Sequence, residues 1–96
     1  MKQKYITAGV CDQISLLTQM MIWQLAASLP VTKDYLQVFT LTPGIVNSRD
    51  VQLLKQNQEI PEYERICTYY CENPLSLKLF MIDDGAYITL MLASEY

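Results

Sequence analysis

Residues 12–30 of the chain have the sequence DQISLLTQMMIWQLAASLP, and this stretch decides the fold. It carries no charge after Asp12, its apolar residues recur at helical spacing, and it ends at Pro30. Asp12 is a suitable N-cap, and the residue before a proline is pushed out of the α region. The sequence therefore predicts one helix from Asp12 to about Ser28. Three glutamines, two serines and a threonine within residues 13–29 argue against a membrane span.

The segments around this helix are apolar, aromatic and β-branched, which is typical of strands. One strand is expected near residues 5–8. Five more are expected at Tyr35–Leu41, Val51–Lys55, Arg65–Tyr70, Leu77–Ile82 and Ala86–Leu92. Asp84-Gly85 tolerates positive φ and predicts a hairpin between the last two strands. The predicted fold class is α+β: one N-terminal helix packed on a mainly antiparallel sheet of five to six strands, in the order β-α-β-β-β-β-β.

Composition supports a single domain over residues 1–96. With 51% hydrophobic and 18% charged residues, a chain of 96 residues has enough apolar side chains for one core. The net charge is -3, and residues 57–96 carry seven acidic and two basic residues. This field repels a phosphate backbone, so generic nucleic-acid binding is not expected.

The chemistry that the sequence lacks limits the function. There is no histidine, which removes the usual general base and metal ligand, and the three glycines are too far apart for a phosphate loop. Cys67 and Cys71 would lie roughly 13 Å apart on a strand, so a zinc site is not expected. Three cysteines suit reduced thiols, and no secretion signal is visible. We expect a cytoplasmic protein that is not an enzyme and has no cofactor, no metal and no membrane contact.

The predicted helix has two apolar faces. Ile14, Leu17, Met21, Ile22, Leu25 and Leu29 form the face expected to cover the sheet. Leu16, Met20, Trp23 and Ala27 form a second stripe, which suits self-association because Trp and Met are favoured at interfaces. The alternative is that a loop such as Pro43–Asp50 covers this stripe within the domain.

The acidic half of the chain is also rich in tyrosine. Tyrosine suits half-wet surfaces, and an acidic, aromatic surface fits a basic protein partner. The candidate partner-binding residues are Glu59, Glu62, Tyr63, Glu64, Tyr69 and Tyr70. Solvated side chains without a role remain the alternative, and Asp83-Asp84 is better explained as a hairpin turn than as a catalytic pair.

Several strings of the sequence resemble a Firmicute family, first described from staphylococci, known as domain of unknown function 960. They are Tyr5-Ile6-Thr7 with Gly9-Val10, Asp34 to Phe39, Gln58 to Tyr63, Lys78 to Asp84 and Met91 to Tyr96. The resemblance spans nearly the whole chain and brings no catalytic residues. Such families occur on plasmids, phages and genomic islands, so it implies an accessory role on a mobile element. Lys55-Gln56-Asn57 lacks a histidine expected in some relatives.

Three hypotheses follow for the function. The first is a small non-enzymatic protein-interaction module, in one form an inhibitor of a host defence system of the anti-CRISPR type that binds a nuclease or another nucleic-acid-binding effector. The second is a homodimeric structural or regulatory module that associates through Leu16, Met20, Trp23 and Ala27. The third is a thiol- or carboxylate-dependent enzyme, for which the sequence offers no base and no oxyanion site.

Overall fold

The computed structural model describes residues 2–96; Met1, the first residue of the predicted domain, lies outside the described residues. Its sheet has six strands in the order β1-β6-β5-β2-β3-β4. The strands are β1 Gln3–Ile6, β2 Leu36–Val46, β3 Arg49–Gln58, β4 Tyr63–Tyr70, β5 Leu77–Asp83 and β6 Tyr87–Leu92. β1 and β6 are parallel and the other neighbours are antiparallel. The predicted α+β class with a mainly antiparallel sheet is confirmed.

The predicted helix is present, but its predicted start at Asp12 is wrong, because two helices occupy this region. They are α1 Ala8–Gln13 and α2 Leu16–Ala27. Ile14 between them is extended, and the Oγ of Ser15 accepts a hydrogen bond from the backbone N–H of Thr18 at 3.2 Å. Ser15 therefore caps α2, whereas Asp12 lies inside α1. The proline stop is confirmed to within one residue, since α2 ends at Ala27.

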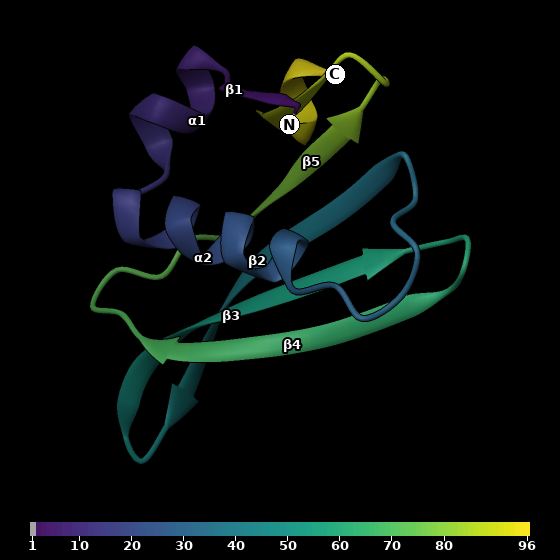
Figure 1. Ribbon diagram of the computed structural model, residues 1–96. Helices are drawn as coiled ribbons and strands as arrows, with labels where there is room; N and C mark the ends of the chain where they lie inside the picture. The colour runs from purple at the N-terminus through teal and green to yellow at the C-terminus, as the bar shows by residue number, and fades with distance from the viewer. Residues whose placement is uncertain (1) are drawn as a thin grey trace.

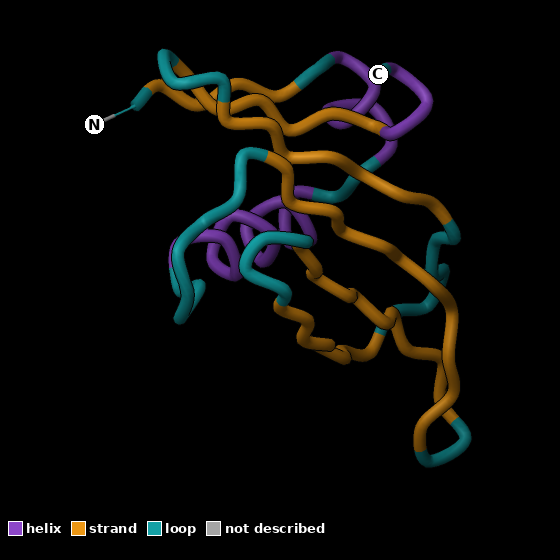
Figure 2. Tube along the Cα trace, turned by 90° about the vertical axis from the view of Figure 1, so that its right-hand side faces the viewer, coloured by secondary structure: helices purple, strands orange, loops and turns teal. Residues whose placement is uncertain are grey.

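Helix α2 lies along β3 and β4, and the twisted sheet curves around it (Figures 1 and 2). Its sheet-facing side carries Thr18, Gln19, Ile22 and Ala26, all buried. Leu17, expected on this side, is 60% exposed. The core also holds residues from α1, the α1–α2 junction and four strands: Val10, Ile14, Phe39, Leu41, Leu54, Leu79, Met81, Ile88, Leu90 and Leu92. α2 therefore covers the sheet with the side that carries Thr18, Ile22 and Ala26, and much of its remaining apolar surface is exposed.

Two tight turns connect neighbouring strands. Asn47 and Ser48 have φ angles of 52° and 63° and join β2 to β3. Residues 43–50 thus belong to a hairpin that extends away from the helices (Figure 2), and the prediction that this segment covers the outer stripe of the helix is wrong. Gly85 has a φ of 98° in the turn between β5 and β6. The predicted hairpin at Asp84-Gly85 is confirmed.

The first and last strands of the chain, β1 and β6, pair with each other at one edge of the sheet. The short helix η1, Ala93–Glu95, follows β6. The Glu95 carboxylate accepts hydrogen bonds from the Thr7 hydroxyl at 2.7 Å and the Leu92 N–H at 2.8 Å, and these bonds lower the pKa of Glu95. Among residues 2–96, no helix is long and apolar enough to cross a bilayer.

Candidate interaction surface

Strand β4 lies at an edge of the sheet with β3 as its only neighbour in the order. The N–H of Cys71 donates to the carbonyl of Asp50 at 3.1 Å, in register with the β3–β4 ladder. Hydrogen-bonded and non-bonded positions alternate along an antiparallel ladder. The odd-numbered residues of β4 therefore pair with β3. The backbone groups that point away from β3 belong to Glu64, Ile66, Thr68 and Tyr70, and we call this row the open edge.

The side chains of β4 are divided between the two faces of the sheet. The odd-numbered residues face α2, and two of them are bound to it. The Tyr69 hydroxyl lies 2.6 Å from the Thr18 hydroxyl, and Arg65 donates to the Leu25 carbonyl and, at 3.0 Å, to the Ser28 hydroxyl. Burial raises the pKa of Tyr69 despite its bond to Thr18. Because α2 begins above Tyr69 and ends above Arg65, it runs antiparallel to β4.

An apolar hollow of about 380 Å³ lies between α2 and the middle of β4. It is lined by Leu17, Met20, Met21, Gln24, Leu25 and Cys67. Leu17 and Met20 are 60% and 61% exposed, and the adjacent Leu16 is 71% exposed. A contiguous exposed apolar patch beside an unpaired strand is typical of a binding site. We call this feature the α2–β4 hollow.

The opposite face of β4 combines aromatic and charged groups. Ile66 is 63% exposed. The guanidinium of Arg49 lies 3.9 Å from the centre of the Tyr70 ring, in a cation–π contact. Glu64 forms an exposed ion pair with Lys55 at 3.5 Å. The two ends of the strand thus carry opposite charge on this face: negative at Glu64 and positive beside Tyr70.

The structure separates the predicted acidic and tyrosine-rich set. Glu59 and Glu62 are exposed in the turn between β3 and β4. Glu64 and Tyr70 lie on the open face, whereas Tyr63 and Tyr69 face α2 and are half-buried. Tyr69 is already bound to Thr18. The set therefore surrounds β4 rather than forming one surface.

The predicted self-association stripe of the helix is largely exposed. Leu16, Met20 and Ala27 are exposed, and Met20 also lines the α2–β4 hollow. Trp23 is half-buried against the core, and the Lys4 ammonium lies 5.6 Å from the centre of its ring. Three of the four residues are thus open to a partner, and Trp23 mainly joins α2 to β1.

A buried network of glutamines on the inner face of β2 and β3 was not predicted. Gln56 accepts from the Arg65 Nε at 2.7 Å and donates to the Oε1 of Gln37 at 3.1 Å, and Gln37 donates in turn to Gln58. Gln58 also donates to the carbonyls of Thr32 and Pro61, at 2.9 and 2.8 Å. In the described part of the chain, no buried side-chain nitrogen or oxygen lacks a partner.

This network fixes the surroundings of the open edge. It joins Arg65 to the end of α2 and holds the turn that carries Glu59 and Glu62 against the segment before β2. Gln52, Gln56 and Gln58 alternate with apolar Leu54 at a spacing of two. This period is the signal that they share one side of a strand. Their polarity suggests the solvent side, but α2 covers Gln56, and the segments at Leu75 and Thr32 bond Gln52 and Gln58.

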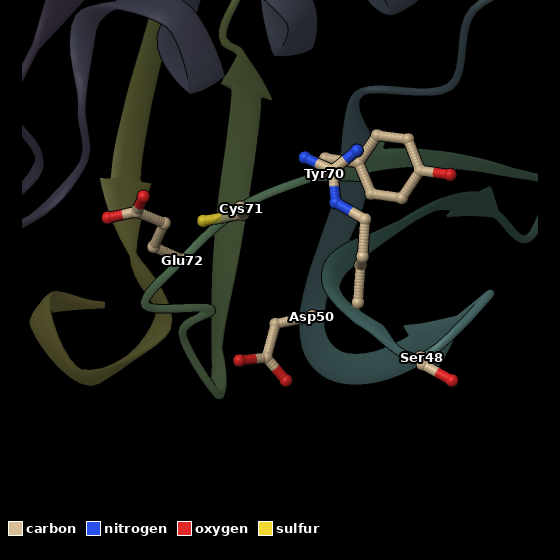
Figure 3. A pocket seen from close by; sticks show the side chains of 6 residues that line it. Ser48, Asp50, Tyr70, Cys71 and Glu72 are labelled. Atoms are coloured by element: carbon tan, nitrogen blue, oxygen red, sulfur yellow. The ribbon is translucent and has the colours of Figure 1, made fainter.

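A second hollow, of about 420 Å³, lies at the other end of β4, lined by Ser48, Arg49, Asp50, Tyr70, Cys71 and Glu72. Figure 3 shows the carboxylates of Asp50 and Glu72 pointing away from each other. No group of three histidine, cysteine or acidic side chains suited to hold a metal occurs within residues 2–96. Cys67, Cys71 and Cys11 are free thiols. This hollow does not gather a base, a nucleophile and an orienting group at one point.

The fold and this surface define a small α+β protein with a mixed six-stranded sheet, one helical layer and an open edge strand. The chain belongs to the family described as staphylococcal protein of unknown function (domain of unknown function 960), whose model matches residues 3–95. The predicted family resemblance is confirmed. No curated protein matches the chain.

One solved structure is similar over nearly the whole chain. It is the crystal structure of a protein of unknown function from Enterococcus faecalis, with a TM-score of 0.80 and 20% sequence identity. The match covers 99% of this chain and 91% of that chain. At this identity the similarity shows a shared fold.

Proposed function

We propose that the chain is a non-enzymatic protein-interaction module that binds an extended polypeptide segment as an additional strand along β4. The observation that carries this proposal is the open edge of β4 beside the α2–β4 hollow. In strand addition, main-chain hydrogen bonds provide affinity and pockets for alternate side chains provide specificity. The open edge provides main-chain hydrogen-bonding groups, and the α2–β4 hollow provides a pocket for side chains.

The two edges of the sheet differ in how well they suit pairing. Native proteins protect edge strands with short length, proline, bulges or charge. β1 has four residues, including Lys4. β4 has eight residues, and Ile66 to Tyr70 contain no charge and no proline. The uncharged stretch Ile66–Tyr70 leaves most of this edge unprotected, which favours a binding role over a purely structural one.

The surroundings define the chemistry of the segment that binds. Side chains that enter the α2–β4 hollow must be apolar, because the hollow is lined almost entirely by carbon and sulfur. Glu59, Glu62 and Glu64 lie near the start of β4, so a basic side chain at that end gains favourable electrostatics. The segment is thus apolar toward α2 and basic toward the turn.

The predicted inhibitor of a host defence system is one specific form of this proposal. A nucleic-acid-binding effector has a basic surface, which suits the acidic turn beside β4. Its support is the net acidic C-terminal part and the implied mobile-element setting, so it stays a prediction.

The test removes a single backbone donor from the open edge. Thr68→Pro deletes an N–H that points away from β3, so the sheet keeps its own hydrogen bonds. Thr68→Val is the matched control, because it keeps the N–H and the β-branched shape. A partner identified from lysate is purified and its affinity is measured with the three chains. We expect roughly 5- to 150-fold weaker binding to Thr68→Pro, since a partner carbonyl left without a donor costs about 1–3 kcal/mol.

The circular dichroism of each variant confirms that it is folded. A folded Thr68→Pro chain that binds the partner as tightly as the wild type would overturn strand addition at β4. Reversal of Glu59, Glu62 and Glu64 to lysine tests the electrostatic part separately, and unchanged affinity would remove the acidic turn from the binding surface.

A further inference from the structure

We infer that the strand bound by β4 is β4 of a second copy, paired antiparallel about a two-fold axis at Cys67 to give a homodimer with one continuous sheet. This inference rests on the proposed strand addition and names its partner. Its occupant must be apolar toward α2 and basic near Glu64. A second copy meets both requirements through residues beside its β4: Leu17 and Met20 of its α2 are exposed and apolar, and its Arg49 lies against Tyr70.

Free and bonded backbone groups alternate along β4, and this alternation limits how two copies can pair. Residues of the open edge must face residues of the open edge, because only they carry free N–H and C=O groups. A symmetric pair of β4 strands can then be centred on any one residue. Only centring on Ile66 or on Cys67 pairs seven residues of the strand Tyr63–Tyr70. These two registers therefore form the longest ladders.

Charge distinguishes the two registers. Centring on Cys67 places Glu64 opposite Tyr70 of the second copy, and the guanidinium of Arg49 lies over that ring at 3.9 Å. Each copy thus brings one carboxylate to one guanidinium, and the contact occurs twice. Centring on Ile66 places Glu64 opposite Thr68, which offers no charge. Opposite charges across a ladder stabilise it, so the register at Cys67 is favoured.

The helical layer independently supports the pairing of two β4 strands, whichever residue lies at the two-fold axis. α2 contacts Gln56 of β3 and Arg65 of β4, so its axis lies above the interval between these strands. Neighbouring strands are about 4.8 Å apart, so pairing of β4 with its copy places the two α2 axes about 10 Å apart. Helices pack at about 8–10 Å. The two helices therefore meet at normal packing distance on the same face of the sheet.

The α2–β4 hollow lies at the centre of this contact. Cys67 is one of its lining residues, and Met20 and Met21 lie near the middle of α2. A two-fold axis at Cys67 brings the two hollows face to face, and the exposed side chains of Leu17 and Met20 from each copy cover the other. An apolar patch and an open edge are thus removed from water by one symmetric contact.

The first test uses cysteine proximity. At a non-hydrogen-bonded pair, facing Cα atoms are about 4.5 Å apart, which a disulfide spans. A chain with Cys67 as its only cysteine (C11S, C71S) is treated with diamide, which takes up the two protons and two electrons released by two thiols. We expect a covalent dimer on a non-reducing gel. The matched chain with Cys71 as its only cysteine should remain monomeric, because Cys71 would face Tyr63.

The second test measures association directly by sedimentation equilibrium. We expect the wild type and Thr68→Val to be dimers, and Thr68→Pro to dissociate at least tenfold more readily. Leu17→Glu changes an exposed side chain, so the chain keeps its fold, and it should weaken the dimer as strongly. Association that is unchanged in both variants would overturn the inference, and cross-linking through Cys71 as efficiently as through Cys67 would overturn the register.

These outcomes separate the dimer from the proposed function. A wild-type chain that stays monomeric at high concentration overturns self-pairing. If a purified partner still binds the monomer and Thr68→Pro weakens that binding, strand addition at β4 is retained, and the added strand belongs to the partner. If Thr68→Pro affects neither association nor partner binding, both proposals are wrong.

Discussion

Gln56 offers a direct test of the buried glutamine network. Its side chain is fully buried, accepts from Arg65 and donates to Gln37. Gln56→Met keeps the volume, so no cavity forms, but it removes the bonds with Arg65, Gln37 and the Leu25 carbonyl. Gln37 is 1% exposed and its Oε1 loses the donor from Gln56, which costs about 1–3 kcal/mol. Arg65 is half-buried, and water replaces part of its lost bond.

We therefore expect Gln56→Met to lower the free energy of unfolding by about 2 kcal/mol. For a chain of this size the melting temperature should fall by about 10 °C. Gln56→Ala should lose about a further 2–5 kcal/mol because it also leaves a cavity at a fully buried position. The measurement is urea unfolding followed by Trp23 fluorescence and circular dichroism. Protein concentration is held fixed, since self-association makes apparent stability depend on it.

The control is Gln13→Met at an exposed position, which should lie within about 0.5 kcal/mol of the wild type. A Gln56→Met chain whose free energy of unfolding lies within the same range would refute the reasoning. It would mean that an apolar side chain of equal size stabilises the fold as well as the hydrogen bonds around Gln56.

Two further predictions concern the helix start and the end of the sheet. Ser15→Ala removes the cap of α2 and should lower the free energy of unfolding by about 1 kcal/mol, measured in urea against the exposed control Ser76→Ala. Glu95 has a lowered pKa in the folded chain, so its bonds stabilise the fold above its ordinary pKa of about 4.3 and are lost as pH falls through the lowered value. The stability difference between wild type and Glu95→Gln should therefore decrease as the pH is lowered below about 4. A difference that is constant from neutral to acid pH would show that the carboxylate of Glu95 has no such role.

The sequence predicted the helical region but not its division. Asp12 and Ser15 are equally suitable cap residues, and local propensity does not choose between them. The structure chooses Ser15 because the Ile14 carbonyl, left free by the break, accepts a bond from Gln19 at 2.8 Å. This contact depends on the packing of α2 on the sheet. It therefore lies beyond what the spacing of apolar residues can predict.

The strand positions were predicted, and their lengths were less accurate. β2 continues past Leu41 through Pro43 to Val46, although proline is unusual in a strand. Beyond Leu41 the strand pairs with β3 alone, since β5 reaches only residues 36–41. This part of β2 is therefore itself an edge, where proline is tolerated. The rule that proline is confined to edge strands holds here, but applying it requires the strand order, which the sequence does not provide.

The candidate site shows the same limit. Alternation along residues 63–70 predicts which side chains share a face. The sequence did not show that β4 is an edge, because the chain leaves β4 and returns to pair with β2 on its far side. The return is held by Gln52, whose amide bonds the N–H and carbonyl of Leu75 at 2.7 and 2.9 Å. No local sequence pattern indicates that the chain crosses from β4 to the far side of β2.

The parallel pairing of β1 with β6 has a consequence for synthesis of the protein. Gln3 pairs with Tyr87, so the partner of the first strand is made 84 residues later. At a translation rate of about 5–20 residues per second, β1 is without its partner strand for roughly 4–17 s before β6 is synthesised. Helix α2 and the β2–β3–β4 meander are complete before then and can fold first. A premature stop before Tyr87 would therefore release a chain whose earliest strand has no place in the sheet, a ready substrate for quality-control proteases.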